Sequence, residues 1–204
     1  MVQPLNITIY LDYICPWCYV ASTRLLMLKK EYGNRVTINW KSFPLNPYSL
    51  QPKYPVARLN EGRLRAGREE RSLHFKLWAE NRPLPDSSIP AHEAAKCAQI
   101  QGEEVFECYQ MALMKAYSSH CRDIADRQVL IALAEEVRLD VRKFISDLES
   151  EWPRKRVFAE RDEGVKNYNV IGVPTVLIGE LAVLEAAVPL EVYKQAVRRL
   201  SVQK

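Results

Sequence analysis

The chain has 204 residues, with 29 Lys and Arg against 25 Asp and Glu, and therefore a formal net charge of +4. Hydrophobic residues make up 48% and charged residues 26%, ordinary values for a globular protein that exclude a disordered or fibrous chain. The small positive charge, without a long run of Lys or Arg, argues against a nucleic-acid partner. No apolar run reaches the roughly 18 to 20 residues that a membrane span needs.

The N-terminal part predicts a strand, a helix and a second strand. Residues 6–13 are rich in β-branched and aromatic side chains that alternate roughly by two, which predicts a strand. Pro16 stands where a helix can begin, and the apolar pattern that follows runs to Tyr32, with Gly33 as a stop signal. Residues 35–43 alternate again, so the predicted order is β-α-β.

The same segment bears on the cell compartment. The first 14 residues contain neither Lys nor Arg, and Asp12 interrupts their apolar stretch, so they do not fit a signal peptide. We therefore expect a cytoplasmic protein. Its five cysteines, an odd number, argue against a disulfide framework and make a close pair a candidate for redox chemistry or metal binding.

The middle of the chain is expected to be helical. Four prolines from Pro44 to Pro55 predict an irregular loop, and the pattern from about residue 60 to 142 is almost wholly helical. A further helix is expected to begin at Pro153.

Strands return near the C-terminus. Residues 175–178 and 181–184 are short and apolar, and they predict a hairpin across Gly179-Glu180. Pro189 then opens a last amphipathic helix. All the elements together predict an α/β domain that is interrupted by an all-helical insertion.

The sequence Cys15-Pro16-Trp17-Cys18 lies directly between the first strand and the first helix. A helix N-terminus favours negative charge, so a sulfur there is stabilised as a thiolate, and two intervening residues bring the second sulfur within bonding range. Cys15 is expected to be the exposed nucleophile and Cys18 the buried resolving thiol. The alternatives are an inert pair and half of a zinc site; zinc needs about four ligands, and no second close pair exists. We expect no metal.

Gly172-Val173-Pro174-Thr175 precedes the third predicted strand. In a chain with Cys-x-x-Cys after its first strand, this turn resembles the cis-proline loop of the thioredoxin superfamily. The resemblance implies that the Val173–Pro174 bond is cis and faces Cys15, and that the Val173 backbone pairs with a bound peptide or thiol. The expected substrate-binding residues are Pro16, Trp17, Val173, Pro174 and Thr175.

Finer matches resemble the DsbA family and its FrnE-like branch. The resemblance implies a thioredoxin-like α/β domain, residues 1–50 plus 153–204, with a large all-helical insertion over 51–152. The matching motifs run through the chain in order: Cys-Pro-Trp-Cys-Tyr at 15–19, Phe-Pro-Leu-Asn-Pro at 43–47, Ala-His at 91–92, Ala-Tyr at 116–117, Arg-Asp-Ile at 122–124, and Gly-Val-Pro-Thr at 172–175.

The chain also departs from this pattern. Gly179-Glu180 replaces the Asn-Gly turn of the branch, and residues 184–189 replace a Ser-Gly-Ala-Gln-Pro-like stretch at the edge of the substrate groove. Cys121 stands where the family often has Gly. Ile9 falls where some relatives carry a buried acid, and Asp12 is the nearest carboxylate. Asp12 is either a capping residue or a proton acceptor for the resolving cysteine.

Other side chains receive structural interpretations. His92 matches the family pattern and is expected to cap or pack the insertion, with an auxiliary role at the site as the alternative. Cys97 and Cys108 lie within helical patterns and are expected to be small core residues. Five arginines alternate with glutamates and predict a solvated surface segment: Arg58, Arg63, Arg65, Arg68 and Arg71.

The function that the motifs indicate is thiol–disulfide exchange on protein thiols or low-molecular-weight thiols. It needs no tightly bound cofactor, with glutathione as an optional co-substrate, and the protein is expected to be a monomer or homodimer. One alternative is a glutathione-dependent isomerase or transferase, which the resemblance to 2-hydroxychromene-2-carboxylate isomerases and kappa glutathione transferases raises. The other is a non-catalytic peptide-binding or chaperone module.

Overall fold

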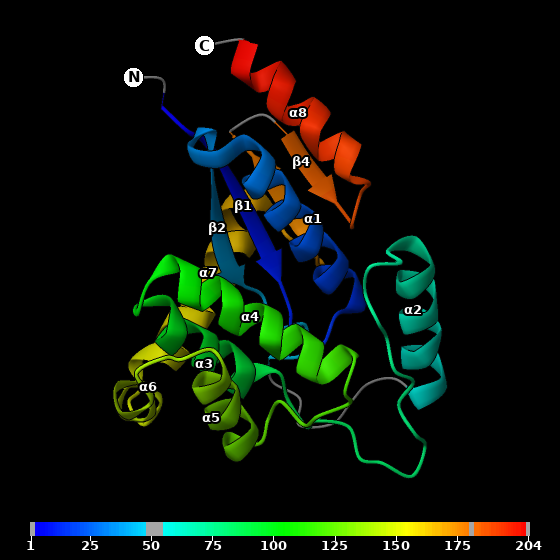
Figure 1. Ribbon diagram of the computed structural model, residues 1–204, viewed down its shortest axis with the longest axis vertical. Coiled ribbons are helices and arrows are strands. Elements are labelled where there is room, and N and C mark those ends of the chain that lie inside the picture. The colour runs from blue at the N-terminus through cyan, green and yellow to red at the C-terminus, as the bar shows by residue number, and fades with distance from the viewer. Residues whose placement is uncertain (1–2, 48–54, 180–181, 203–204) are drawn as a thin grey trace.

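The computed structural model describes residues 3–47, 55–179 and 182–202 (Figure 1). Its centre is a four-stranded sheet in the order β2-β1-β3-β4, in which β1 and β2 are parallel and the other neighbours are antiparallel. The strands are β1 (Leu5–Leu11), β2 (Val36–Ser42), β3 (Thr175–Ile178) and β4 (Ala182–Glu185). The sheet therefore joins the two ends of the chain.

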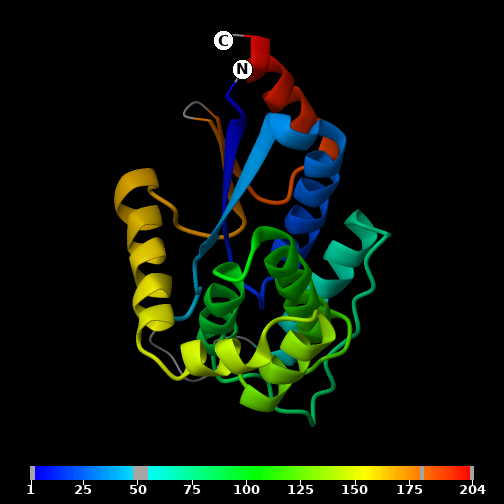
Figure 2. The ribbon, with the colours of Figure 1, turned by 60° about the vertical axis from the view of Figure 1, so that its left-hand side comes forward.

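Helices cover both faces of the sheet and one of its ends. Helices α1 and α8 lie on one face and α7 on the other (Figure 2), while α2 to α6 gather where β1 ends and α1 begins (Figure 1). The bounds are α1 (Pro16–Tyr32), α2 (Val56–Glu69), α3 (Ile89–Gln99), α4 (Glu103–Ser118), α5 (Arg127–Glu136), α6 (Val141–Leu148), α7 (Trp152–Tyr168) and α8 (Leu190–Val202), with a short 3₁₀ turn at Gly33–Arg35. None of the helices in the described ranges is both long and apolar enough to cross a membrane.

The predicted α/β fold with helices inserted into it is confirmed. The β-α-β start and the β-β-α end both appear, with helices α2 to α7 between them. The boundaries of the insertion, 51 and 152, stay a prediction. Glu180 and Leu181 of the expected hairpin and Pro52 of the expected loop lie outside the described residues.

One expectation about the helical block is wrong. Residues 70–88 contain no helix, although the pattern from residue 60 onward predicted nearly continuous helix. Pro83 and Pro85 cannot donate the backbone hydrogen bonds of a helix interior. The segment is held by Trp78, which is 1% exposed and donates from its indole nitrogen to the Arg82 carbonyl at 3.0 Å.

The larger of two hydrophobic clusters among the described residues runs from the sheet into the helical block; the smaller one consists of Tyr10, Phe43, Val170 and Leu177. Strand β1 is the axis of the larger cluster, because Ile7 and Ile9 are fully buried between β2 and β3. Leu25 and Leu28 of α1 join them, and the same cluster continues to α4 through Phe106. The end of β1 is therefore fixed by packing from both parts, which is what a precise site at that point requires.

A buried ion pair also joins the helical block to the sheet. Lys96 of α3 and Glu160 of α7 are each 3% exposed and their charged atoms lie 2.7 Å apart. Burial lowers the pKa of Lys96. Burial alone would raise the pKa of Glu160, but Lys96 and the backbone N–H of Ser42 in β2 hold it below its usual value. Removing one partner of such a pair typically costs about 3–5 kcal/mol.

Helix α7 approaches the sheet closely at Gly164. A Cβ there would lie 2.8 Å from the ring of Tyr10, a fully buried side chain of β1. We therefore expect Gly164→Ala to lower the free energy of unfolding by about 1–3 kcal/mol, although alanine usually stabilises a helix interior by about 1 kcal/mol. Urea unfolding followed by circular dichroism measures the change.

Gly62→Ala is the matched control. Gly62 also lies inside a helix, but a Cβ there would meet Pro16 at 3.7 Å, an ordinary contact. Its free energy of unfolding should stay level or rise by up to about 1 kcal/mol. Equal stability of the two variants would mean that α7 is not pressed against Tyr10.

Candidate active site

The two cysteines of the Cys-Pro-Trp-Cys motif lie at the start of α1 with different degrees of burial. Cys15 is the extended N-cap residue, Pro16 opens the helix, and Cys18 follows one turn later. Pro suits this position because its missing N–H would have no helical partner. Cys15 is 8% exposed and Cys18 is fully buried, and both are free thiols. The predicted burial of Cys18 is confirmed, whereas Cys15 is more covered than predicted.

The cis-proline loop explains why Cys15 is covered. The Val173–Pro174 peptide bond is cis, as the resemblance implied. Strand β3 brings this loop to the end of β1, because Thr175 pairs with Tyr10 in the sheet. The Cys15 thiol then faces the Val173 carbonyl, with Sγ and the oxygen 3.6 Å apart. Residues that are 158 positions apart in the sequence thus meet at one sulfur.

The buried thiol of Cys18 resists ionisation. Burial, a hydrogen bond with Cys15 and the charges of Cys15 and Asp12 raise its pKa well above the usual value. The backbone N–H of Asp12, 3.4 Å from the Cys18 sulfur, acts in the opposite direction. Cys18 is therefore a protonated thiol at neutral pH, and an incoming reagent reaches Cys15 first.

A shallow pocket of about 220 Å³ opens beside the cis-proline loop. The Ile171 side chain at its rim is 81% exposed, and Glu185 is its single charged lining residue. Ala186, directly after β4, also lines this pocket and donates its N–H to the Pro174 carbonyl at 2.9 Å. The remaining lining residues are Gly172, Val173, Pro174, Thr175 and Ala186.

Pro16 and Trp17 lie on the other side of Cys15. Both are half-buried, and the Trp17 side chain packs against the hydrophobic core. The α2 helix runs beside them, because Gly62 is in contact range of Pro16. The structure thus brings all five expected substrate-binding residues to the vicinity of Cys15. Two of them follow Cys15 in the chain, and the other three belong to the cis-proline loop.

Asp12 is a buried anchor next to the motif. Its carboxylate is fully buried and accepts from the backbone N–H groups of Ile14 and Leu45, at 3.3 and 2.7 Å. It also accepts from the Ser88 hydroxyl at 3.1 Å and lies 3.3 Å from Nε2 of His92. Ile14 precedes α1, whose N-cap is Cys15 without a side-chain cap, so Asp12 holds the turn before the helix and the capping interpretation is wrong. Transfer of a proton from Cys18 to Asp12 stays a prediction.

His92 occupies the N-terminal turn of α3 and is fully buried. Besides its contact with Asp12, its ring packs on Tyr13 with centroids 4.8 Å apart. His92 is a packed residue, as predicted, and it joins the helical block to the residues just before Cys15. Its auxiliary role at the site stays a prediction. Sequence reasoning missed Ser88 and the Leu45 backbone in this network, because nothing in a local pattern pairs them with Asp12.

Two other expectations are corrected. Cys97 is a buried core residue as predicted, but Cys108 is exposed because it lies on the outer side of α4. Arg63 is not part of a solvated segment: it is fully buried and donates to the carbonyls of Tyr117 and Ser118. Its guanidinium offsets the negative end of α4. Among the described residues, no cluster of three His, Cys, Asp or Glu side chains could hold a metal ion.

Comparison with known proteins shows the family of the chain. The family model described as "DSBA-like thioredoxin domain" matches residues 6–198. The chain belongs to this family. Protein YwbO of Bacillus subtilis is 26% identical over 199 residues, which are 94% of this chain and 95% of YwbO. The ClpXP adapter protein SpxH of the same organism is 27% identical over 150 residues. The match covers 73% of this chain and 50% of the length of SpxH.

Solved structures share the fold over nearly the whole chain. A putative protein disulfide isomerase from Nitrosomonas europaea has a TM-score of 0.84 at 15% identity, covering 98% of this chain and 99% of that one. The cytosolic disulfide reductase DsbM from Pseudomonas aeruginosa has a TM-score of 0.73 at 20% identity, covering 98% of both chains; a second DsbM structure includes GSH. A 2-hydroxychromene-2-carboxylate isomerase reaches a TM-score of 0.73 at 19% identity and 97% coverage of both.

The buried charge of Asp12 should contribute to the raised pKa of Cys18, after the larger effects of burial and of Cys15. Because that charge helps to raise the pKa of Cys18, we expect Asp12→Asn to lower this pKa. Each oxygen of the Asp12 carboxylate contacts two of its four partners. In Asn one oxygen becomes an NH₂ group, which is a donor and cannot accept from them, so the free energy of unfolding should fall by about 1–3 kcal/mol. The Cβ chemical shift of Cys18, followed against pH in a Cys15→Ser background, measures the pKa.

Ser88→Ala is the control for this prediction, because it removes one donor and keeps the Asp12 charge. Its Cys18 pKa should stay closer to the parent value than that of Asp12→Asn. A Cys18 pKa that is unchanged or higher in Asp12→Asn would show that the carboxylate does not act on the thiol.

Proposed function

We propose that this protein catalyses thiol–disulfide exchange through Cys15 and Cys18, on protein thiols or low-molecular-weight thiols. The observation that carries the proposal is the position of the Cys15 sulfur, at the N-terminus of α1 and 3.6 Å from the carbonyl of Val173 in the cis-proline loop. A helix N-terminus favours negative charge on that sulfur, and the loop offers backbone groups to a bound substrate.

The unequal burial of the two thiols gives each a role. In the oxidising direction, a substrate thiolate attacks the Cys15 sulfur of the Cys15–Cys18 disulfide. The bond between the two cysteines breaks, and Cys18 leaves with the electron pair and takes up a proton. A second substrate thiolate then attacks the substrate sulfur of the mixed disulfide, and Cys15 leaves as a thiolate. The substrate loses two electrons and the protein gains them.

In the reducing direction the same steps run backwards. The Cys15 thiolate attacks a substrate disulfide and releases one substrate thiolate, and Cys18 then loses its proton and displaces the second. Asp12, whose backbone N–H lies 3.4 Å from the Cys18 sulfur and whose charge acts on that thiol, is the proposed acceptor of this proton. Pro16, Trp17, Val173, Pro174 and Thr175 surround the mixed disulfide as substrate-binding residues. No step needs a metal or a tightly bound cofactor.

The relatives supply further support. DsbM shares this fold and is named a disulfide reductase, and one of its structures includes GSH. Glutathione is therefore part of the proposal as a co-substrate that forms the mixed disulfide with Cys15. A glutathione-dependent isomerase on the same scaffold would have no use for a second, buried thiol one turn from the first. The pair of cysteines favours exchange for this reason.

Substitution of each cysteine separates the roles. We expect Cys15→Ser to reduce exchange with glutathione disulfide to the uncatalysed rate, because no sulfur remains at the helix start. We expect Cys18→Ser to hold glutathione on Cys15, because the resolving thiol is gone. Equilibration with glutathione buffers, followed by thiol alkylation and mass spectrometry, measures both.

Cys108→Ser is the matched control, since Cys108 is exposed on α4 and outside the site; it should exchange like the unmodified protein. A protein that forms no reversible Cys15–Cys18 disulfide in any glutathione buffer would contradict the proposal. Turnover of an aromatic electrophile that depends on added glutathione would then favour the isomerase or transferase alternative. Peptide binding that survives loss of both cysteines would favour a binding module.

A further inference from the structure

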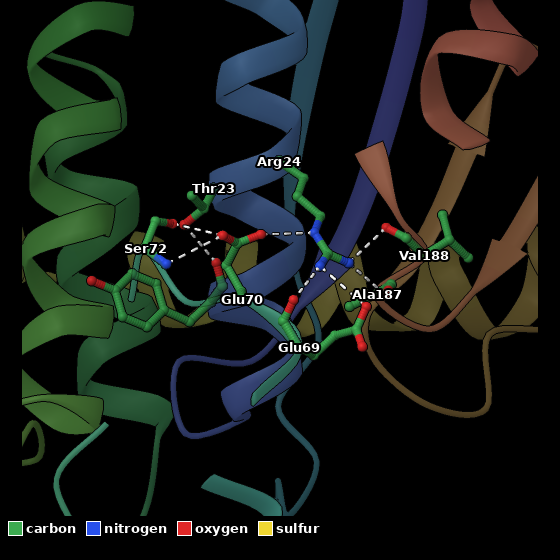
Figure 3. A network of polar contacts seen from close by, with 8 residues as sticks. Thr23, Arg24, Glu69, Glu70, Ser72, Ala187 and Val188 are labelled. Carbon is green, nitrogen blue, oxygen red and sulfur yellow. Dashed lines mark hydrogen bonds and ion pairs between the residues drawn. The ribbon is translucent and has the colours of Figure 1, made fainter. Parts of the chain in front are cut away.

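Arg24 is a buried arginine on α1, six residues after Cys18. Its side chain is 6% exposed. Its Nε donates to Glu70 at 3.0 Å, Nη1 donates to the carbonyls of Ala187 and Val188 at 3.1 and 3.0 Å, and Nη2 donates to the carbonyl and side chain of Glu69 at 3.0 and 3.3 Å (Figure 3). One guanidinium thus ties the active-site helix to two distant segments of the chain.

The first segment is the end of α2, which lies on one side of Cys15. Glu69 is the last residue of α2 and Glu70 follows it, and Glu70 also accepts from the Ser72 hydroxyl at 2.7 Å. Two turns earlier, the same helix passes close to the active-site motif, because a Cβ added at Gly62 would lie 3.7 Å from Pro16. The bonds from Arg24 therefore fix α2 relative to the helix that carries the cysteines.

The second segment is the loop between β4 and α8, on the other side of Cys15. Ala187 and Val188 directly follow Ala186, whose N–H donates to the Pro174 carbonyl of the cis-proline loop. Ala186 has a φ of 99°, a left-handed conformation that a side chain disfavours and that its surroundings must hold. The two bonds from Nη1 of Arg24 hold the loop just after this residue.

We propose that the substrate lies in a groove between α2 and the Ala186–Val188 loop, and that Arg24 is a positioning residue that sets the distance between these two sides. The proposal rests on the proposed exchange function. The carboxylates of Glu69 and Glu70 already neutralise its charge, so its role is to hold structure in place. Arginine suits this task because its planar group donates five hydrogen bonds in fixed directions, which lysine does not.

A substrate that touches both sides depends on this spacing. A peptide or protein segment bound along the cis-proline loop spans the groove, whereas a small dithiol needs only the sulfur of Cys15. Loss of Arg24 should therefore weaken the productive binding of peptides and change the reaction with small thiols little. This split separates a positioning role from a general loss of folding.

The test compares Arg24→Gln with Lys29→Gln. Lys29 lies on the same helix and pairs with Glu103 and Glu107 of α4, so it also joins α1 to the helical block, but away from the groove. For each variant, the Cys15–Cys18 disulfide is first formed. The rate at which it is reduced is then measured with dithiothreitol and with a peptide of several residues that has one central cysteine. For Arg24→Gln we expect the KM of the peptide to rise about tenfold and the rate with dithiothreitol to change by less than about twofold. Lys29→Gln should change neither.

Two further measurements keep the proposal decidable. Glu70→Gln tests the proposal if Arg24→Gln does not fold. It keeps a neutral acceptor for Arg24 and should raise the KM of the peptide by about threefold. Hydrogen exchange of the amides in 56–69 and 186–188 should be faster in Arg24→Gln, with α4 unchanged. Three results would overturn the proposal. Arg24→Gln could slow the reactions with peptide and dithiothreitol equally, Lys29→Gln could raise the KM of the peptide as much as Arg24→Gln does, or hydrogen exchange could stay unchanged in both segments.

These outcomes also separate the two proposals. A wild-type protein that exchanges with neither dithiothreitol nor peptide would refute the proposed function. Hydrogen exchange would then still decide whether Arg24 holds α2 and the 186–188 segment in place.

Discussion

The site depends on one buried charge. The carboxylate of Asp12 lies where β1 ends, and it is fully removed from solvent. A charge in that position is tolerated only when donors surround it, and here they come from Ile14, from Leu45 after β2, and from Ser88 and His92 at the start of α3. The requirement to satisfy one carboxylate thus draws the sheet, the loop after β2 and the helical block to the residues just before the cysteines. The ion pair of Lys96 and Glu160 likewise joins α3 and α7 to the end of β2, where the Ser42 N–H donates to Glu160.

The chemistry of the motif follows from where this arrangement leaves each sulfur. Cys18 lies inside the core, where burial and nearby negative charge keep its thiol protonated. Cys15 lies at the helix N-terminus and is 8% exposed, with its sulfur next to the carbonyl of Val173, a residue that lines the pocket. A reagent therefore meets one sulfur before the other, and this order of attack is what dithiol exchange requires. Similar residues with equal exposure would lack that order.

Buried arginines supply much of the connection between segments. Arg63 joins α2 to the C-terminal end of α4, and Arg24 joins α1 to the end of α2 and to the loop before α8. Each uses a planar group with several fixed donors to satisfy carbonyl oxygens that would otherwise be buried without partners. Helix α2, which has few buried apolar residues of its own, is held against the site largely by these polar contacts.

Residues adjacent in the chain were enough to predict the order of strands and helices and the Cys-x-x-Cys motif at a helix start. The cis-proline loop was expected from the family resemblance, because Gly172-Val173-Pro174 alone indicates only a turn. Local patterns also predicted the burial of Cys18, because it lies one turn into a helix. They did not reveal the burial of Arg63 and Arg24, the partners of Asp12, or the absence of helix over 70–88. The buried arginines and the partners of Asp12 depend on residues tens of positions apart that meet only in the folded chain. The break in the helical block instead reflects the local signal of Pro83 and Pro85, which the apolar pattern outweighed. Whether an arginine faces water or a set of carbonyl oxygens is decided by that tertiary packing, since its own neighbours in sequence are the same in either case.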